Sequence, residues 1–201
     1  MNSIRWKTAL YIILVITAVV SLVNWLFSDQ IFTFQFVGDC IGKSVSLITL
    51  LSGLFCTRLW KCRIFQKWLV LIPNLNGLWE GEIESTWIDP KTNEKKSAIP
   101  AILIVNQSLF KTSCLIKTDE SMSRSITANF IIDKENQVCK LVYTYQNDSN
   151  QTLREKSPIH YGTAALDIQE RNGKILLCGN YWTDRKTNGY LSFCFQTDKN
   201  K

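Results

Sequence analysis

Several kinds of chemistry are excluded because this 201-residue sequence has few of the residues that they need. It contains one histidine, His160, so a metal site built from several histidines is excluded. Neither a G-x-x-x-x-G-K-[ST] phosphate loop nor a G-x-G-x-x-G dinucleotide fingerprint occurs. The carboxylates of Glu80, Glu82 and Glu84 alternate along one segment, which is typical of a solvated strand face. We therefore predict no metal, no cofactor and no enzymatic activity.

Cysteine pairs with metal or redox spacing are also missing. The seven cysteines are odd in number, and none forms a C-x-x-C pair. Four of them lie inside apparent strands, where a free cysteine packs as a small apolar residue: Cys114, Cys139, Cys178 and Cys194. A disulfide-bonded secreted domain would show a different pattern, so we expect a reducing compartment.

Excess positive charge is confined to one part of the chain. Residues 1–73 hold seven basic and two acidic residues, whereas residues 74–201 hold sixteen basic and fifteen acidic residues. The basic excess therefore accompanies the apolar segments. It indicates membrane topology and lipid contact rather than a domain that binds DNA or RNA polymers.

What the sequence does contain is a long uncharged run, Thr8–Ser28, followed by a second apolar segment. Twenty-one helical residues span the roughly 30 Å hydrocarbon core of a bilayer, so the run predicts a membrane span. A cleaved signal peptide would be shorter, with a small-residue cleavage site. A buried helix of a soluble protein would seldom be so long without a polar face.

The second predicted span covers about Cys40–Leu59, with Lys43 able to extend toward the interface. A re-entrant or interfacial helix is the alternative. Small and hydroxyl residues along it suit close helix packing, either within a hairpin or between copies: Ser44, Ser46, Thr49, Ser52 and Gly53.

The flanking charges predict the orientation of this hairpin. Arg5 and Lys7 precede the first span, and four basic residues lie within 58–67, whereas the connection 29–43 holds one lysine and two aspartates. By the positive-inside rule both termini lie in the cytoplasm. We expect residues 60–72 to form an amphipathic linker, either a short helix on the inner leaflet or an extension of the span. Pro73 then marks the boundary between the anchor, 1–73, and a cytosolic domain, 74–201.

The cytosolic domain shows the alternation of half-buried strands. In 79–87, Trp79, Gly81 and Ile83 alternate with glutamates. Eight such runs are separated by turn residues: 78–88, 96–106, 109–118, 123–133, 138–146, 159–170, 174–183 and 189–197. They predict an all-β domain, a lipocalin-like eight-stranded up-and-down antiparallel barrel, with a β-sandwich as the alternative.

The longer polar loops fall at the end of the barrel away from its first residue, where they would surround an open mouth. Aromatic rings can stack on bases and basic side chains can neutralise phosphates. The residues near this mouth that we predict to contact a ligand are Arg124, Tyr143, Tyr145, His160, Tyr181, Trp182, Arg185 and Thr187.

Strand parity predicts which of these side chains point inward. Arg124 shares parity with Ile126 and Phe130, and His160 with Gly162 and Leu166, so both are expected inside. We expect Gly81, Gly162, Ala164 and Gly179 to leave room in the interior or to bend the wall. A register slip of one residue would reverse each orientation.

Two apolar helices followed by a small barrel form an uncommon order. With Asn76-Gly77-Leu78-Trp79-Glu80-Gly81 and Gly179-Asn180-Tyr181-Trp182-Thr183, the chain resembles the two-transmembrane, β-strand-rich effectors of bacterial cyclic-oligonucleotide-based antiphage signalling (CBASS). The resemblance implies a bacterial inner-membrane receptor for a cyclic dinucleotide. Binding would drive self-association and membrane disruption, with growth arrest or cell death.

Two other functions fit the pattern of residues. One is a membrane-anchored carrier of an apolar ligand, which predicts a dry aromatic interior. The other is a structural anchor whose barrel binds a protein by its outer surface, which predicts an interior filled by side chains.

Overall fold

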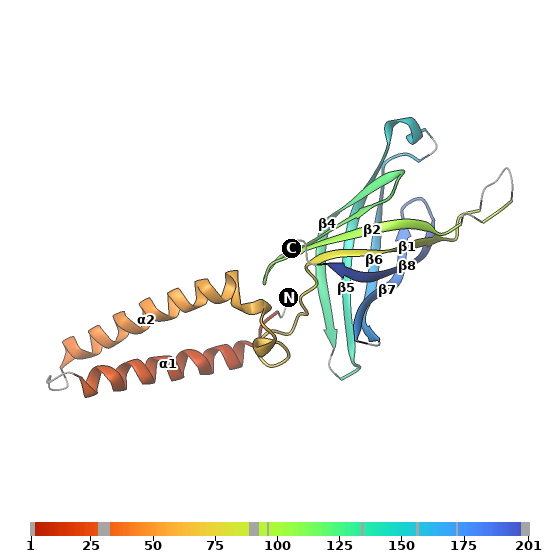
Figure 1. Cartoon of the computed structure of the whole chain (residues 1–201). Helices are drawn as coiled ribbons and strands as arrows, with labels where there is room; N and C mark the ends of the chain where they lie inside the picture. Colours follow the sequence, from red (N-terminus) through yellow and green to blue (C-terminus); the bar gives the residue numbers. More distant parts are fainter. Residues whose placement is uncertain are drawn as a thin grey trace. The chain divides into compact units, whose positions relative to one another are not determined.

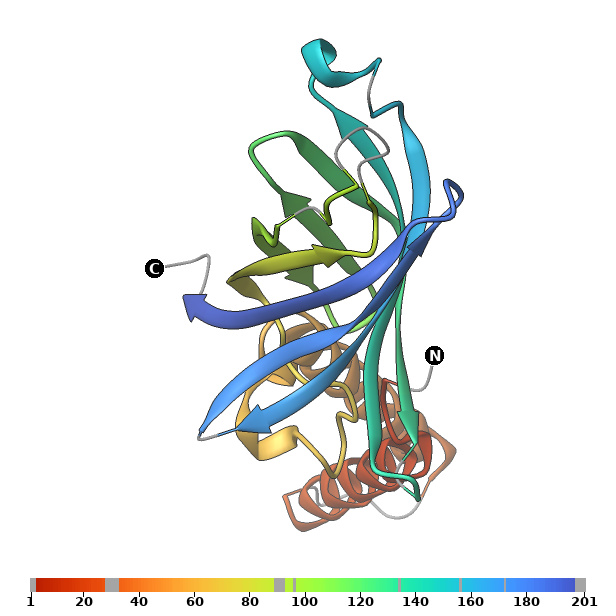
Figure 2. The same ribbon diagram turned by 90° about the vertical axis from the view of Figure 1, so that its right-hand side faces the viewer.

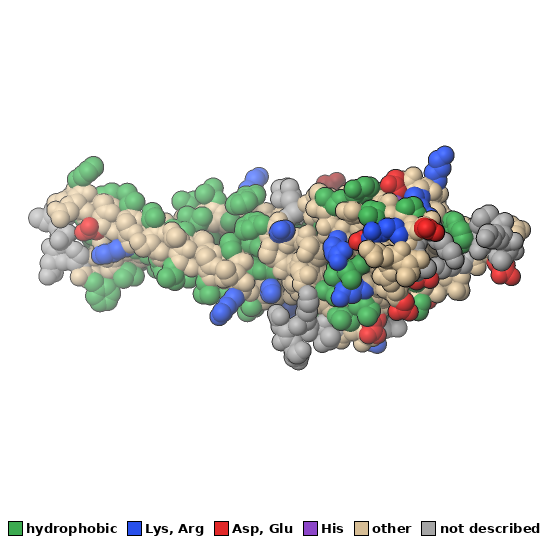
Figure 3. Space-filling view, turned by 90° about the horizontal axis from the view of Figure 1, so that it is seen from above, with side chains coloured by type: hydrophobic (Ala, Val, Ile, Leu, Met, Phe, Trp, Pro, Cys, Tyr) green, Lys and Arg blue, Asp and Glu red, His purple; other side chains and the backbone are tan. Residues whose placement is uncertain are grey.

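The structure is a computed structural model that describes residues 3–27, 33–88, 93–95, 97–133, 135–155, 157–171 and 173–197 (Figure 1). The chain divides between Pro73 and Asn74 into two compact units, a helical hairpin and a barrel. Hydrophobic side chains cover the hairpin, whereas basic and acidic side chains are intermixed on the barrel (Figure 3). We describe each unit in turn.

The hairpin consists of α1, Trp6–Leu26, and α2, Phe34–Thr57. Both helices are long and apolar enough to cross a membrane, and α1 has no buried residue. Large exposed apolar side chains along both helices need lipid or another protein surface around them, because water solvates them poorly. The hairpin therefore suggests membrane anchoring.

The second helix starts earlier than the predicted span. It begins at Phe34 rather than Cys40, because the Thr33 hydroxyl accepts a hydrogen bond from the Phe36 N–H at 3.3 Å and caps the helix. Its buried side chains, Phe36, Cys40 and Ser44, recur every fourth residue, as one face of a helix does. A Cβ built on Gly42 meets no atom within 4 Å.

The segment after α2 is not an amphipathic helix, so that expectation was wrong. It forms two short 3-10 turns, η1 at Leu59–Lys61 and η2 at Arg63–Phe65. Lys67 then adopts a positive φ of 73°, which a continuing helix cannot accommodate. The following backbone pairs with the start of the chain instead: the Arg5 N–H donates to the Leu69 carbonyl at 3.0 Å.

The second unit is a closed barrel in which each strand pairs antiparallel with its sequence neighbours and β1 pairs with β8, as the sequence predicted. Figure 2 shows β5 and β6 running along its wall. The strands are β1 Gly77–Ser85, β2 Ile99–Gln107, β3 Thr112–Lys117, β4 Ser121–Asp133, β5 Val138–Ser149, β6 His160–Arg171, β7 Lys174–Thr183 and β8 Asn188–Thr197.

The two ends of the barrel differ. We call the end where Gly77 begins β1 the base and the opposite end the rim. The connections at the base are short, as between β6 and β7, where only residues 172–173 intervene. The rim carries the longer connections, including the one between β5 and β6 with its 3-10 turn η3, Gln151–Leu153 (Figure 1).

Large apolar side chains fill the interior toward the base. Trp79, Leu103 and Leu141 are inaccessible to solvent, and the Trp79 indole N–H donates to the Leu75 carbonyl at 3.1 Å. The Trp79 ring also meets the Phe195 ring edge to face, with centroids 5.1 Å apart. The base end of the interior is therefore a packed hydrophobic core that stabilises the domain.

One irregularity changes the predicted orientation in β4. The register with β5 shifts between Ser125 and Thr127, so Ile126 is an extra residue and is 61% exposed. Phe130, beyond this bulge, faces inward, whereas before the bulge the even-numbered residues face outward. Arg124 therefore points outward, which corrects the prediction that it lines the interior.

Candidate functional site

The interior changes character along β5, from apolar at the base to polar at the rim. Its inward-facing side chains follow one another at every second residue: Leu141, Tyr143, Tyr145, Asn147 and Ser149. All five are buried, although the last two are amide and hydroxyl groups. Buried polar groups need hydrogen-bond partners, and this end of the barrel supplies them.

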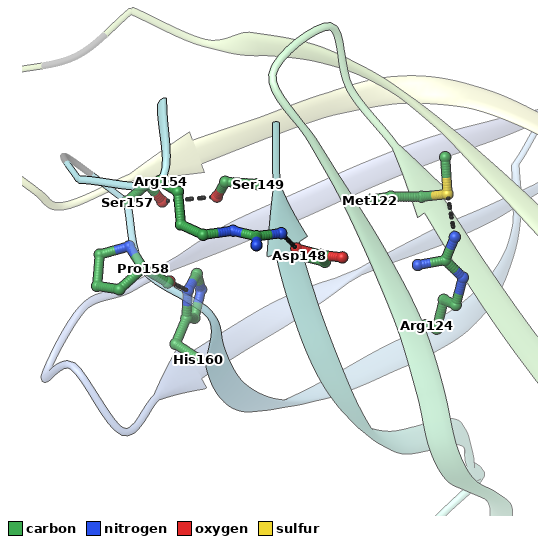
Figure 4. Close-up of polar contacts among 8 residues, drawn as sticks. All are labelled: Met122, Arg124, Asp148, Ser149, Arg154, Ser157, Pro158 and His160. Carbon is green, nitrogen blue, oxygen red and sulfur yellow. Dashed lines mark hydrogen bonds and ion pairs between the residues drawn. The ribbon is translucent and has the colours of Figure 1, made fainter. Parts of the chain in front are cut away.

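Partners for these groups come from the neighbouring strand and from the loop after β5. The Ser123 hydroxyl on β4 donates to Asn147 Oδ1 at 2.8 Å. Ser149 Oγ donates to Ser157 Oγ at 3.0 Å (Figure 4). His160 pairs with Asn147 across β5 and β6 and is half-buried at the rim. Hydroxyl and amide groups of this kind can exchange these bonds for bonds to a polar ligand.

The two tyrosines below this polar group lie against each other, with ring centroids 6.0 Å apart. Burial raises the pKa of Tyr145, and the nearby Tyr181 and Asp184 raise it further. Burial also raises the pKa of Tyr143, so both phenols stay neutral hydrogen-bond donors at physiological pH. Among the described residues, the Tyr143 hydroxyl has no hydrogen-bond partner.

The inward-facing glycines do not leave the space that the sequence predicted. A Cβ on Gly162 would lie 2.5 Å from the Tyr145 hydroxyl oxygen, so this ring covers the glycine. A Cβ on Gly81 would lie 2.8 Å from Cδ1 of Phe193. These glycines are therefore positions where aromatic rings lie directly on the backbone of the wall.

Charged side chains at the rim stand around this polar end. Arg185 Nη1 in the β7–β8 turn donates to Ser157 Oγ at 3.2 Å. Arg154 pairs with Asp148 at 2.7 Å, and both side chains are partly exposed. The guanidinium of Arg185 is exposed and is thus available to a phosphate that approaches from solvent.

A shallow cleft of about 530 Å³ lies beside the rim, over β1, β7 and β8. Tyr181 and Gly189 belong to its inner side, whereas Trp182 and Tyr190 lie on the outer face of the wall. Its volume is within the range of small-molecule sites. Its other lining residues are Glu84, Ser85, Thr86, Lys95, Asn180 and Asn188.

The predicted site residues fall into two groups. The structure places five of them in the interior of the barrel or at its rim: Tyr143, Tyr145, His160, Tyr181 and Arg185. The other three lie elsewhere. Trp182 is on the outer face, where it is 49% exposed, and Arg124 donates from Nη2 to Met122 Sδ on the outside of β4 (Figure 4). Thr187 closes the β7–β8 turn through a 2.7 Å bond between its hydroxyl and that of Thr183.

Sequence reasoning missed the polar residues that surround the tyrosines. Asn147 and Ser149 have the same parity as Tyr143 and Tyr145, so continuing the alternation would have placed them inside. Ser123 could not be found in this way, because the bulge at Ile126 reverses the parity of β4.

The comparison with known families bears directly on this domain. A family model described as "Cap15, cyclic dinucleotide receptor domain" matches residues 70–194, which is more than half of the chain. The chain belongs to the Cap15 family. The search of curated proteins finds no match.

Membership in the Cap15 family agrees with the resemblance to a CBASS membrane effector that the sequence indicated. The matched region includes the first seven strands of the barrel and most of the eighth. The barrel is thus a Cap15 cyclic dinucleotide receptor domain, and the two apolar helices before it fit a membrane effector.

Proposed function

We propose that this protein is an antiphage effector whose barrel binds a cyclic dinucleotide at the polar end of its interior. The observation that carries this proposal is the combination of the receptor-domain match with the neutral polar groups of Asn147, Ser149 and Tyr145 below an exposed arginine. Uncharged hydrogen-bond donors can bind the bases and riboses of such a ligand, and the Arg185 guanidinium can bind a phosphate.

Binding would act by favouring an assembled state of the membrane hairpins. A ligand shifts such an equilibrium only through a higher affinity for one state. Support for assembly comes from the resemblance to the CBASS effectors and from the exposed apolar surface of α1 and α2, which is available to lipid or to a second copy. Many hairpins packed together would disrupt the bilayer and stop growth or kill the cell.

The proposed location is the bacterial inner membrane, crossed twice, with both termini in the cytoplasm. The basic flanks of the hairpin support this orientation through the positive-inside rule. The barrel would then face the compartment in which a nucleotide second messenger is made.

We propose a binding role without catalysis, metal, cofactor or a nucleic-acid polymer as partner. His160, the single histidine, makes a 3.0 Å hydrogen bond from Nδ1 to the Pro158 carbonyl, so the backbone rather than a nucleophile orients its ring. The nearly balanced charge of residues 74–201 gives little attraction to a polyanion.

The test is the thermal unfolding of the full chain in lipid nanodiscs. The panel comprises cyclic di-GMP, cyclic di-AMP, cyclic GMP–AMP and cyclic UMP–AMP, with the linear dinucleotide pGpG and oleate for comparison. A ligand at 100 times its Kd stabilises the folded state by about 2.7 kcal/mol. A shift with a cyclic dinucleotide supports the proposal. A shift with oleate alone would indicate the apolar carrier, and no shift with any probe the structural anchor.

A further inference from the structure

The Tyr143 hydroxyl is an unsatisfied donor inside a receptor domain. Its side chain is 2% exposed, and no hydrogen-bond partner is found for it among the described residues. Leaving a buried hydroxyl without a partner is unfavourable, so a phenylalanine would suit the barrel by itself better. The packing of the barrel therefore does not explain why residue 143 is a tyrosine rather than a phenylalanine.

The surroundings of this hydroxyl are neutral. On the strands beside β5, Ala128 and Ala164 pair with Tyr143, and both are small. Cys114 on β3 is buried nearby, and burial raises the pKa of its thiol to about 12, so it carries no charge. A phosphate among these groups would lose its hydration without gaining a positive partner, whereas the edge of a nucleobase would meet no such penalty.

A charged side chain lies at the other end of the same column of residues. Arg185 is exposed at the rim and reaches Ser157, the hydrogen-bond partner of Ser149. His160 is half-buried at the level of Asn147, and the two tyrosines lie below it. This gradient from charged to neutral matches a nucleotide, whose phosphates and base are at opposite ends. The polarity of the interior therefore fixes the direction in which such a ligand fits.

We propose that one nucleobase of the cyclic dinucleotide inserts edge-first into the barrel and accepts a hydrogen bond from the Tyr143 hydroxyl, while the phosphodiester ring stays at the rim. This inference rests on the proposed function and adds the orientation of the ligand and a residue that recognises its base. Tyr145, whose ring covers Gly162 between the rim and Tyr143, turns aside and stacks on the base.

Tyr143→Phe tests the proposal, because it removes the hydroxyl and keeps the ring. Tyr161→Phe is the matched control, since Tyr161 lies on the outer face of β6 and is 50% exposed. Both variants of the full chain are titrated in nanodiscs with the four cyclic dinucleotides named above. The melting temperature without ligand is measured as well.

We expect Tyr143→Phe to weaken binding about tenfold, the effect of one lost hydrogen bond, equally at 50 and 300 mM salt. Its melting temperature without ligand should equal or exceed that of the wild type. Arg185→Ala should instead weaken binding by an amount that falls with salt.

The outcomes separate the two proposals. If the wild type binds a cyclic dinucleotide and Tyr143→Phe binds it equally well, the inserted base is refuted while the receptor function stands. A lower melting temperature for Tyr143→Phe would show that the hydroxyl supports the fold, which also refutes the inference. If the wild type binds none of the four, the receptor function itself fails.

Discussion

The wall of the barrel allows a quantitative prediction at Gly162, where the backbone lies under an aromatic ring. An alanine Cβ there would lie 2.5 Å from Cζ of Tyr145 and 2.9 Å from the Trp182 carbonyl oxygen. Ordinary carbon contacts are about 3.5–4.0 Å, so the end of the ring must move by about 1 Å. This movement is possible because the ring lies at the end of a rotatable side chain, and the strand itself needs to shift little.

At Gly81 the same substitution meets the backbone. Its Cβ would lie 1.8 Å from the Ser192 carbonyl oxygen on β8, and the two strands would have to separate. Overpacking of a core destabilises by about 1–3 kcal/mol. We expect Gly162→Ala to be near the lower limit of this range and Gly81→Ala at its upper limit or above.

Thermal unfolding of the full chain, followed by circular dichroism in detergent micelles, measures this difference. For a domain of this size, each kcal/mol corresponds to roughly 4 °C in Tm. Gly42→Ala in α2, where a Cβ meets no atom within 4 Å, is the control and should leave the unfolding of the barrel unchanged. If Gly162→Ala destabilises the barrel as much as Gly81→Ala, the Tyr145 ring cannot move aside to make room for the added methyl group.

Three further predictions concern charge and ionisation. Arg185→Ala should weaken cyclic dinucleotide binding about three- to tenfold at low salt, because it removes an exposed guanidinium at the rim. Arg124→Ala, on the outer face, should bind as the wild type does. Equilibrium titration compares the two variants, and equal losses of affinity would contradict the placement of the ligand at the rim. The pKa of Cys114 is raised from 9.0 to about 12 by burial, so the folded state holds this proton more tightly and stability falls as pH rises above 9. At pH 10 the loss of unfolding free energy is about 1.4 kcal/mol, and Cys114→Ala should remove it. Urea unfolding of both proteins at pH 8 and pH 10 measures this difference. The same pH dependence in the two proteins would refute the raised pKa of Cys114. At pH 8 iodoacetamide should modify the exposed Cys62 and leave Cys114 unmodified until the barrel unfolds, as peptide mass analysis would show.

The strands could be predicted from the sequence because successive side chains of a barrel strand alternate between the apolar interior and the solvent. Trp79 and Gly81 face inward and Glu80 and Glu82 outward, so the period of two is visible in the residues themselves. The same rule extended along β5 would also have found Asn147, which shares the parity of the tyrosines.

Features that depend on the rest of the fold could not be predicted in this way. An extra residue in a strand changes parity but not composition, so the alternation wrongly places the exposed Ile126 in the core, and Arg124 with it. The segment 60–72 has the apolar spacing of a helix, but extended backbone at Cys62 and Gln66 and the positive φ of Lys67 interrupt it. The backbone there pairs with Ser3 and Arg5, a contact that no local pattern reveals.

The central claim is that the polar end of the barrel interior receives a cyclic dinucleotide. The most direct measurement is isothermal titration calorimetry of the full chain in nanodiscs with each of the four cyclic dinucleotides, for the wild type and for Asn147→Ala. We expect saturable binding of at least one cyclic dinucleotide by the wild type, and weaker binding by Asn147→Ala, which lacks a buried amide at the polar end. Equal affinity in that variant would place the ligand elsewhere, and no binding of any of the four would contradict the central claim.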